Sequence, residues 1–464
     1  MGEAELPLTL DRNGPGPLAA QLADQLRKAI LSGVLRPDHT LPATRRMASG
    51  LGISRGVVVR AFEQLAGEGF LQSQGAGGTR VVIRPDVQHP VLKERPVPQI
   101  RDSMPIIDLT PGRPSGTPLR DREWHTAWRQ AVTGSGPMHL PPPLGTDTLR
   151  QAIAGHLAVS RGLAVEPEDV IITAGTSDAL HLAVAALRNR TEHPRILLED
   201  PGYPTARRVM AAAGAVLETV PVDEDGLKAS QLDRLERLPD AVLITPSHQY
   251  PLGGRMPVQE RLDLLNWAAK HGVLVLEDDY DSEFRHRRMP LPAVASLPSE
   301  ADVALLGTFS KTLSPWLRCG YLVVRGHSGH TLKAMRENLD TPVPGIMQTA
   351  LAHYIQAGGL ARHTTRARRE YAHRRKLLLE RLGDRPDLQL AALDGGLHAL
   401  LRFQEKDALQ LAEEALRRGV RLATLAPYYA DRAPENGLVI GYGAPSDLQL
   451  TKALDIITEL LDAP

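Results

Sequence analysis

One lysine in this sequence stands among side chains that suit a phosphorylated cofactor. Lys311 lies in TFSKTLSPWLRCGY, where Thr308 and Ser310 offer hydroxyl groups and Arg318 offers a guanidinium. A lysine amine can form a Schiff base with an aldehyde, and hydroxyl and guanidinium groups bind phosphate. Because most lysines only solubilise a surface, the argument depends on what else accompanies Lys311.

The segment EDDYDSEF holds a carboxylate and a phenol at strand spacing. Asp278 and Tyr280 are two residues apart, so on a strand they project to the same side of the sheet. A carboxylate keeps a pyridine nitrogen protonated, as an electron-accepting ring requires, and a phenol can hold the ring oxygen. The acidic cluster could instead bind a divalent metal, but no second carboxylate or histidine group follows at a recognisable spacing. We therefore expect no metal site.

Two further segments come after predicted strands. Thr176 and Ser177 come directly after VIITAG and open a helix, where backbone N–H groups and hydroxyls suit a phosphate, although such residues can also be a simple helix cap. Tyr203 in DPGYP could stack on a planar ring, although a lone tyrosine is more often just half-buried. Their order along the chain, ahead of the carboxylate, the phenol and the lysine, favours a single site.

Apolar runs alternate with helical patterns from residue 106 onward. The strand-like runs are VIITAG, ILLED, AVLITP, VLVLEDD and ALLGTFS, and amphipathic stretches such as VQERLDLLNWAAKHG lie between them. Alternation of this kind predicts an α/β domain with a largely parallel sheet, whose ligand lies beyond the carboxyl ends of the strands. Every side chain named above is predicted to lie there.

The N-terminal segment has a different pattern. An apolar stripe at Leu18, Leu22, Leu26 and Ile30 predicts a helix over roughly residues 15–32. A short second helix is expected from Thr44, as its N-cap, to Ser49, and glycines supply the turn after it. A third helix, capped by Ser54, should turn Val58, Ala61, Phe62 and Leu65 inward. Helix, glycine-containing turn and helix is the helix-turn-helix pattern.

The segment GFLQSQGAGGTRVVIR then predicts a hairpin with glycines at its tip, the wing of such a module. No acidic residue lies between Thr44 and Arg60, which indicates an anionic partner. In a winged helix-turn-helix, the start of the third helix enters the major groove of DNA. We expect base edges to be faced by Ser54, Arg55, Gly56 and Val59 at the start of the third helix. We expect phosphate contacts from Arg45, Arg60 and Arg80. A packing module whose arginines are only solvated is the alternative.

Residues 85–105 join the two regions. Five prolines, at positions 85, 90, 96, 98 and 105, predict an extended and rather stiff tether. The predicted domains are therefore 10–84, a linker at 85–105, and 106–464.

The composition restricts the remaining possibilities. The 464 residues carry a formal net charge of zero, and the single cysteine, Cys319, excludes an internal disulfide or a multi-thiolate metal site. No apolar run reaches the length of a membrane helix and the start is acidic, so we expect a cytoplasmic protein.

These segments resemble known families. LPATRRMASGLGISRGVVVRAFEQLAGEGFLQSQGAGGTRV resembles the winged helix-turn-helix of the GntR superfamily, and the series from the GTS turn to Arg318 resembles fold-type-I aminotransferases of class I and II. The second resemblance implies pyridoxal phosphate bound to Lys311, with Asp278 at the pyridine nitrogen, Tyr280 at the 3′ oxygen and Tyr203 stacked on the ring. It implies that the phosphate is bound by Thr176, Ser177, Thr308 and Arg318. It also implies a smaller α+β subdomain and a homodimer.

The sequence departs from an ordinary aminotransferase in two places. Tyr250, in TPSHQYPLGG, stands where the family has an asparagine that binds the 3′ oxygen. NGLVIGYG has apolar residues where the arginine for a substrate carboxylate is expected, and the replacements we consider are Arg207, Arg421 and Arg432.

With these departures and its DNA module, the chain resembles the MocR/GabR subfamily, in which the aminotransferase-like domain is an effector sensor. The resemblance implies a regulator that binds operator DNA and senses pyridoxal phosphate, or an amino compound, through Lys311. Transamination would be absent or incidental. Two alternatives stay open: a working aminotransferase or bifunctional protein, and a DNA-binding protein whose large domain has lost its cofactor.

Overall fold

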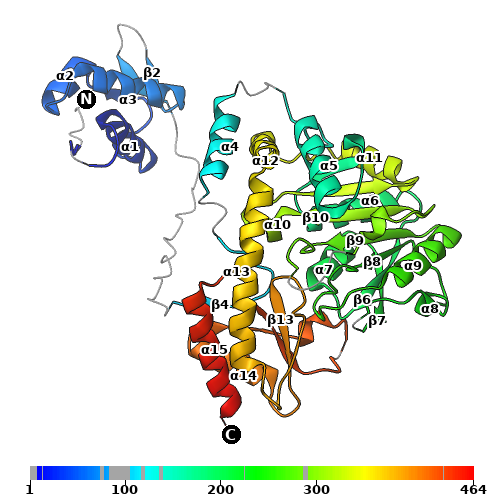
Figure 1. The fold of residues 1–464 in the computed structure, drawn as a ribbon. Helices are drawn as coiled ribbons and strands as arrows, with labels where there is room; N and C mark the ends of the chain where they lie inside the picture. The colour runs from blue at the N-terminus through cyan, green and yellow to red at the C-terminus, as the bar shows by residue number, and fades with distance from the viewer. Residues whose placement is uncertain are drawn as a thin grey trace. The chain divides into compact units, whose positions relative to one another are not determined.

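The chain divides into two compact units, Met1–Arg101 and Asp102–Pro464, in the computed structural model (Figure 1). The structure describes residues 8–12, 14–73, 78–82, 105–116, 121–134, 139–223, 225–285, 291–431 and 433–463. The predicted linker lies almost wholly outside these residues, so its extended form and the exact domain boundaries stay predictions.

The N-terminal unit is a winged helix-turn-helix. Its helices are α1 (Leu18–Leu31), α2 (Thr44–Gly50) and α3 (Arg55–Gly67), and its strands are β1 (Thr40–Leu41), β2 (Leu71–Ser73) and β3 (Thr79–Val81). The hairpin β2–β3 is antiparallel as expected, but β1 adds a third strand beside β3 that the sequence did not predict. The wing glycines at 75 and 77 lie outside the described residues.

The helices pack as their apolar patterns predict. Leu22, Leu26 and Ile30 of α1 have no exposed surface, and the inward face of α3 is buried along its whole predicted length. The prediction that Thr44 is the N-cap of α2 is wrong, because Ala43 holds that position and Thr44 is the first helical residue. The Thr44 hydroxyl instead lies 3.4 Å from the Nε of Arg55, which brings the starts of α2 and α3 together.

The C-terminal unit is built on a seven-stranded sheet in the order β5-β11-β10-β9-β8-β6-β7 (Figure 1). All neighbouring pairs are parallel except those of β11, which runs against β10 and β5. The strands are β5 (Val170–Thr173), β6 (Arg195–Asp200), β7 (Val216–Pro221), β8 (Ala241–Ile244), β9 (Leu274–Asp279), β10 (Val303–Thr308) and β11 (Gly320–Arg325). The largely parallel sheet of the sequence prediction is confirmed, with β11 as the one reversed strand.

Helices cover both faces of this sheet, because the strand residues that point to each face are apolar. One face packs against α6 (Thr176–Leu187), α7 (Pro204–Ala212) and α11 (Ser328–Leu339). The other packs against α5 (Asp147–Arg161), α9 (Val258–His271) and α12 (Gly345–Gln356). The sheet is therefore a buried platform that fixes the position of the segment after each strand. Three further helices of this unit are α4 (Arg122–Thr133), α8 (Ala229–Leu232) and α10 (Phe309–Thr312).

A smaller subdomain completes this unit. Its antiparallel sheet has the order β12-β13-β16-β15, formed by Gln389–Ala391, His398–Arg402, Gly437–Gly441 and Ala423–Thr424. The helices α13 (Gly359–Leu382), α14 (Ala408–Arg417) and α15 (Asp447–Asp462) belong to the same subdomain. The short strand β4 (Ile107–Asp108) pairs with β14 (Val420–Arg421), which ties the start of this unit to its C-terminal part. Among the described residues, no helix is long and apolar enough to cross a membrane.

The core of the N-terminal unit gives a first prediction. Leu65 is fully buried there, so Leu65→Ala should destabilise this unit by about 2–5 kcal/mol. Leu31→Ala, at a position that is 38% exposed on α1, is the matched control and should change stability by less than about 0.5 kcal/mol.

Tryptophan fluorescence does not report on this unit, because all four tryptophans lie in the other unit. Hydrogen exchange of residues 18–81 is therefore the suitable measurement. Exchange that stays as slow in Leu65→Ala as in the control would contradict the packing described here.

Candidate functional site

A cavity of about 160 Å³ lies where β5, β9 and β10 end. All eight residues that the sequence predicts for the cofactor line it: Thr176, Ser177, Tyr203, Asp278, Tyr280, Thr308, Lys311 and Arg318. The structure thus brings together side chains from four separate segments, as their positions after predicted strands implied. Thr245, Tyr250, Ser310 and Pro315 line the same cavity.

The amine of Lys311 is held inside this cavity. It follows β10 on α10, and its Nζ donates a hydrogen bond to the carbonyl of Gly112 over 2.8 Å. Gly112 has a φ of +83°, a conformation that favours glycine, and a Cβ there would lie 2.4 Å from that Nζ, so a larger residue would displace the amine. Burial lowers the pKa of Lys311, while the carboxylates of Asp278 and Asp281 oppose the shift. A lowered pKa increases the neutral, nucleophilic fraction of the amine.

Asp278, at the end of β9, is a buried carboxylate that lacks a full set of hydrogen bonds in the described part of the chain. The residue is 4% exposed, and its Oδ1 has no hydrogen-bond partner among the described residues. Burial first, and then the charge of Asp279, raises the pKa of Asp278 to about 7. A buried carboxylate oxygen without a partner is costly and suits a ring N–H that would donate to it.

Another part of the cavity suits a phosphate. Thr176 and Ser177 are the first two residues of α6, where backbone N–H groups have no partner within the helix. Thr308 and Arg318 line the same cavity. Arg318 adopts a φ of +44°, which is uncommon for a residue other than glycine; such strained residues cluster at functional sites. Hydroxyls, N–H groups and a guanidinium together form an anion-binding site.

Aromatic rings form another wall of the cavity. The rings of Tyr203 and Tyr250 meet edge to face with centroids 5.9 Å apart, and Tyr250 meets Tyr428 at 5.4 Å. Burial raises the pKa of Tyr203 and of Tyr250, so both hydroxyls stay protonated at neutral pH. A planar ring can stack here, and Tyr250 reaches the cavity from the position where the aminotransferase pattern has an asparagine.

The three arginines considered for an effector carboxylate do not line this cavity among the described residues. Arg207 donates to the main-chain carbonyls of Pro427, Tyr428 and Tyr429 at 2.6–3.1 Å. Arg421 lies 3.2 Å from the carboxylate of Asp108. Arg432 lies outside the described residues. In the described cavity lining, Arg318 is the only arginine, and it is the residue that the sequence predicts for the phosphate.

The predicted DNA-contacting residues are accessible. Arg45, Ser54, Arg55 and Arg60 are exposed, while Arg80 on β3 is half-buried. Ser54 holds the N-cap position of α3, but its side chain makes no capping hydrogen bond, so its hydroxyl is not committed to the helix. The start of α3 therefore presents polar and basic groups to solvent, as a recognition helix requires.

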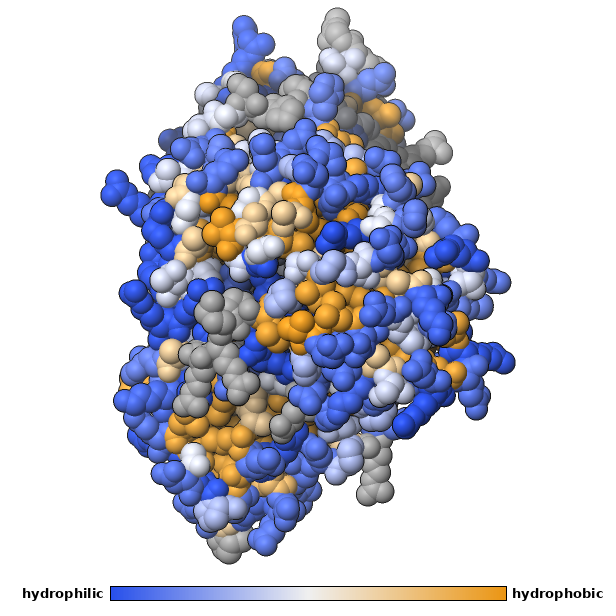
Figure 2. Space-filling model, turned by 45° about the vertical axis from the view of Figure 1, so that its right-hand side comes forward, coloured by the Kyte–Doolittle hydropathy of each residue, from blue (hydrophilic) through white to orange (hydrophobic). Residues whose placement is uncertain are grey.

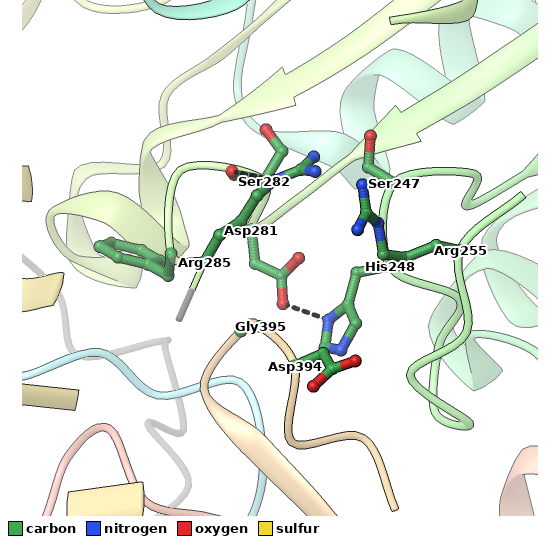
Figure 3. Close-up of a pocket in the computed structure, with 10 residues that line it drawn as sticks. Ser247, His248, Arg255, Asp281, Ser282, Arg285, Asp394 and Gly395 are labelled. Carbon is green, nitrogen blue, oxygen red and sulfur yellow. Dashed lines mark hydrogen bonds and ion pairs between the residues drawn. The ribbon is translucent and has the colours of Figure 1, made fainter. Parts of the chain in front are cut away.

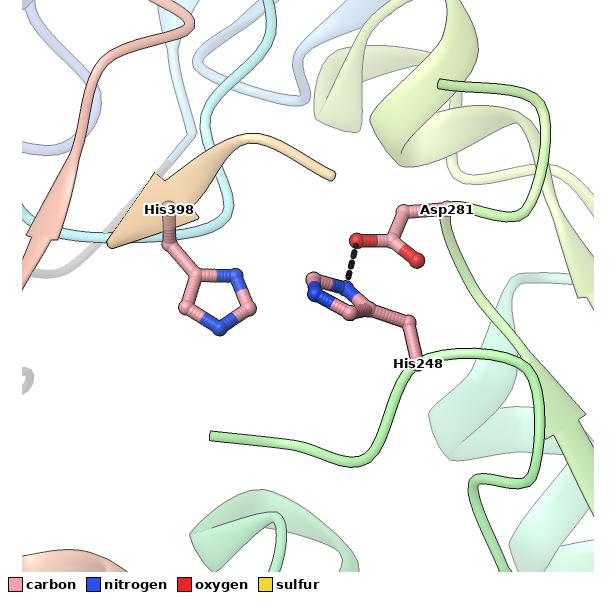
Figure 4. Close-up of side chains that lie close together, drawn as sticks. All are labelled: His248, Asp281 and His398. Atoms are coloured by element: carbon pink, nitrogen blue, oxygen red, sulfur yellow. Dashed lines mark hydrogen bonds and ion pairs between the residues drawn. The ribbon is translucent and has the colours of Figure 1, made fainter. Parts of the chain in front are cut away.

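Sequence analysis missed a buried group beside the cavity. His248, Asp281 and His398 bring their nitrogen and oxygen atoms within 4.8 Å of one another (Figure 4). His248 and Asp281 also line a small pocket with Arg255 and Arg285 (Figure 3). Asp281 lies in the acidic segment already singled out, but nothing in the spacing of the two histidines along the chain connects them to it.

Two family descriptions match the chain. Residues 18–81 match the gntR family of bacterial regulatory proteins, and residues 105–457 match aminotransferase class I and II. The HTH-type pyridoxine biosynthesis transcriptional regulator PdxR of Corynebacterium glutamicum is 39% identical and covers 98% of each chain. The probable rhizopine catabolism regulatory protein MocR of Rhizobium meliloti is 33% identical, over 94% of this chain and 92% of its own. Transcription regulators thus match both parts of the chain, joined in the same order.

Solved aminotransferases have the fold of the larger unit. An archaeal alanine:glyoxylate aminotransferase superposes with a TM-score of 0.71 at 23% identity, covering 77% of this chain and 91% of its own. LysN of Thermus thermophilus, an α-aminoadipate aminotransferase solved with N-(5′-phosphopyridoxyl)-L-leucine, superposes with a TM-score of 0.68 at 26% identity, covering 77% and 92%.

Replacing Asp278 should stabilise the cofactor-free protein and weaken cofactor binding. Its pKa is raised above the ordinary value near 4, so the native state holds this proton more tightly than the unfolded chain does. Without cofactor, its contribution to stability is therefore lost as the pH rises through about 7. At about pH 8, Asp278→Asn should raise the stability of the cofactor-free protein, by roughly 1–4 kcal/mol, and should weaken binding of pyridoxal phosphate.

Thermal unfolding with and without the cofactor measures both effects. Asp302→Asn is the control, because the Asp302 carboxylate already accepts hydrogen bonds from His327 and Ser328 and its loss should destabilise the protein. A cofactor-free Asp278→Asn protein that is less stable than wild type would contradict the account of this carboxylate.

Proposed function

This chain belongs to the MocR type of GntR transcription regulators, and from that premise we propose that pyridoxal phosphate itself is the effector it senses. The cofactor binds in the cavity at Lys311 and controls how the winged helix-turn-helix holds operator DNA. One observation carries the proposal: the cavity has partners for every part of the cofactor, while its described lining has no arginine left for an amino-acid carboxylate.

Each part of the cofactor would be held by different residues of the cavity. Lys311 would supply the amine for a Schiff base, and Asp278 would keep the pyridine nitrogen protonated. Tyr280 would hold the 3′ oxygen, and Tyr203 would pack on the ring. Thr176, Ser177, Thr308 and Arg318 would hold the phosphate. When bound, the cofactor supplies an electron-accepting ring, and sensing needs only its attachment, not turnover.

The contacts that these arginines make favour the cofactor over an amino compound as effector. Arg207 has its guanidinium committed to three main-chain carbonyls, and Arg421 to Asp108. Arg207 would have to break these contacts before it could bind the carboxylate of an amino-acid effector. The name of the C. glutamicum relative, a regulator of pyridoxine biosynthesis, supports the same proposal.

The DNA contacts follow from the N-terminal unit. Ser54 and Arg55, at the start of α3, read base edges in the major groove, and Arg45, Arg60 and Arg80 bind phosphates. Cofactor binding acts by population shift: it favours the arrangement of the chain that binds the cofactor more tightly. The regulator works without a membrane, in the cytoplasm.

A second copy of the chain completes the proposed regulator. Apolar side chains gather in patches on the face shown in Figure 2, and Trp316 is 89% exposed beside Pro315, a residue of the cavity wall. A homodimer that covers such side chains would seal the cavity from water and pair two DNA-binding units. Light scattering of the purified chain gives its mass and tests this part of the proposal.

A working aminotransferase is the second candidate function. It is favoured by the complete set of cofactor residues and by the 2-aminoadipate transaminase of T. thermophilus, which is 30% identical over 61% of this chain and 73% of its own. Steady transfer of amino groups to a keto acid over many turnovers would establish it. A single round of transfer would be compatible with the sensor.

The test of the proposed function is a titration of the full-length protein with DNA from its own upstream region. We expect pyridoxal phosphate to change the DNA affinity by roughly 5–150-fold, and a panel of amino compounds, including γ-aminobutyrate and taurine, to add nothing further. Lys311→Ala should abolish the change. An effect that requires an amino compound would overturn the cofactor as effector, and no effect of either would overturn the sensor.

Arg55→Ala tests the DNA contacts separately. Loss of a base contact should weaken specific binding by about 1–3 kcal/mol and leave uptake of pyridoxal phosphate unchanged, because the change lies in the other unit. Lys28→Ala on α1 is the control, since it removes one exposed charge from the same unit away from the start of α3. Equal weakening by both variants would show only a general charge effect, and loss of cofactor uptake in Arg55→Ala would refute the separation of the two activities.

A further inference from the structure

A buried histidine–carboxylate pair lies directly behind Tyr280. The Tyr280 hydroxyl donates to the main-chain carbonyl of His248 over 2.9 Å and lies 3.1 Å from the Nδ1 of that histidine. The same Nδ1 is 2.9 Å from Oδ2 of Asp281. Both His248 and Asp281 are nearly inaccessible, at 5% and 3% exposure. Tyr280 lines the cofactor cavity, so this pair is one side chain away from it.

The carboxylate fixes which nitrogen of His248 carries the proton. An ionised Asp281 can only accept, so the Nδ1–H of His248 donates to it. The other nitrogen, Nε2, is buried and has no hydrogen-bond partner among the described residues. Among the described residues, the hydrogen-bonding contacts of the His248 ring are therefore those with Asp281 and Tyr280.

His398 faces the edge of His248 that points away from Asp281 (Figure 4). The two rings have centroids 5.0 Å apart, and Nε2 of His398 is 3.2 Å from the carbonyl of Pro251, to which it donates. Burial, helped by the nearby His248, lowers the pKa of His398 to about 3, so this ring is neutral. It packs against His248 without supplying a charge.

The backbone closes over the pair from the smaller subdomain. Gly396 has a φ of +71°, and a Cβ on it would lie 2.2 Å from Oδ2 of Asp281 and 2.6 Å from Cε1 of His248. Figure 3 shows His248 and Asp281 joined across this pocket, with Gly395 beside them. Only a glycine fits at position 396, and the hydrogen bond between the two side chains is shielded from water.

A metal ion fits this group poorly. Two histidines and a carboxylate have a suitable composition, but Arg255 and Arg285 line the adjoining pocket and Lys311 lies on the other side. Three cations around the group disfavour a fourth. A hydrogen bond between His248 and the Asp281 carboxylate, without a metal ion, is the arrangement that these surroundings favour.

We propose that His248 is a positioning residue which, held by Asp281, fixes the Tyr280 hydroxyl and shields the Asp281 charge, and so sets the protonation state in which the cavity holds pyridoxal phosphate. Tyr280 has one proton, and that proton is directed to the carbonyl of His248. Its oxygen lone pairs are then what it offers to the cavity. The inference rests on the proposed function in one respect, that the cofactor binds where Tyr280 lies.

The surrounding charges are the same in every variant needed for a test. Burial first, and then Asp281, raises the pKa of Tyr280 well above the usual range, and Tyr250, Asp278 and Glu199 add to the shift. His248 is faced by Arg255, Arg285 and Asp394 across the pocket. Differences between variants of His248 and Asp281 therefore report the pair itself.

The experiment uses the full-length protein loaded with pyridoxal phosphate and follows its visible absorbance from about pH 5 to about pH 9. Asp281→Asn removes a negative charge that favours the protonated form, so the midpoint of the absorbance change should fall by about one pH unit. His248→Gln leaves the Asp281 carboxylate without its shield, so the midpoint should rise. The double variant should match Asp281→Asn alone, because no charge is left to shield.

His156→Gln is the matched control. His156 forms a comparable pair with Glu283, at 2.8 Å, but does not line the cavity. Its loss should move the midpoint by less than about 0.2 pH units. Shifts of Asp281→Asn and His248→Gln in the same direction, or shifts as small as that of the control, would overturn the proposal and leave the pair a packing element.

A second measurement needs no cofactor. Nitrogen-15 NMR of labelled histidine in the cofactor-free protein should find His248 protonated at Nδ1, where Asp281 accepts its proton. Protonation at Nε2 in the wild-type protein would overturn the proposal. If the wild-type protein takes up no pyridoxal phosphate, the proposed function fails, while this measurement still decides the state of the pair.

Discussion

Asp278 imposes the constraint on which the site depends. A carboxylate that is almost fully buried, with one oxygen unpartnered among the described residues, costs free energy unless a cation or a strong donor meets it. Its neighbours Asp279 and Asp281 increase that cost. Lys311 is the nearby cation, but the hydrogen bond that its Nζ makes is to the carbonyl of Gly112. We propose that Asp278 meets the protonated ring of the cofactor, and that the other contacts of the site depend on where that ring lies.

The parallel sheet makes such an arrangement possible. Side chains separated by more than a hundred residues, such as Thr176 and Lys311, meet because the strands before them end at the same edge. Apolar residues on both faces hold the strands in register, so the sheet contributes rigidity and the residues after its strands contribute the chemistry. The winged helix-turn-helix is stabilised by a separate core, which allows each unit to keep its own specificity.

Much of this arrangement could be predicted from the sequence, because it depends on local patterns. The inward face of α3 follows from helical spacing, and the positions of Asp278 and Tyr280 follow from strand spacing. Their roles in binding stay predictions. The antiparallel strand β11 was missed because a buried strand reads the same in either direction. Thr44 was misassigned as a cap, since a helix can begin one residue earlier without a polar cap.

The pair behind Tyr280 could not be predicted at all. His248 follows β8, Asp281 follows β9, and His398 begins a strand of the smaller subdomain, so only the folded chain connects them. The commitment of Arg207 to carbonyls of residues 427–429 is equally nonlocal. Our proposals about the effector rest on both contacts, which explains why sequence patterns identify a cofactor more readily than they identify the molecule that is sensed.

The central claim is that cofactor and DNA binding are coupled, and thermodynamic reciprocity tests it most directly. The dissociation constant of pyridoxal phosphate should be measured with and without saturating operator DNA. Our account predicts a change by the same factor as the cofactor causes in DNA affinity, within the roughly 5–150-fold range of such couplings. An unchanged dissociation constant would contradict it, because the two units would then bind cofactor and DNA independently.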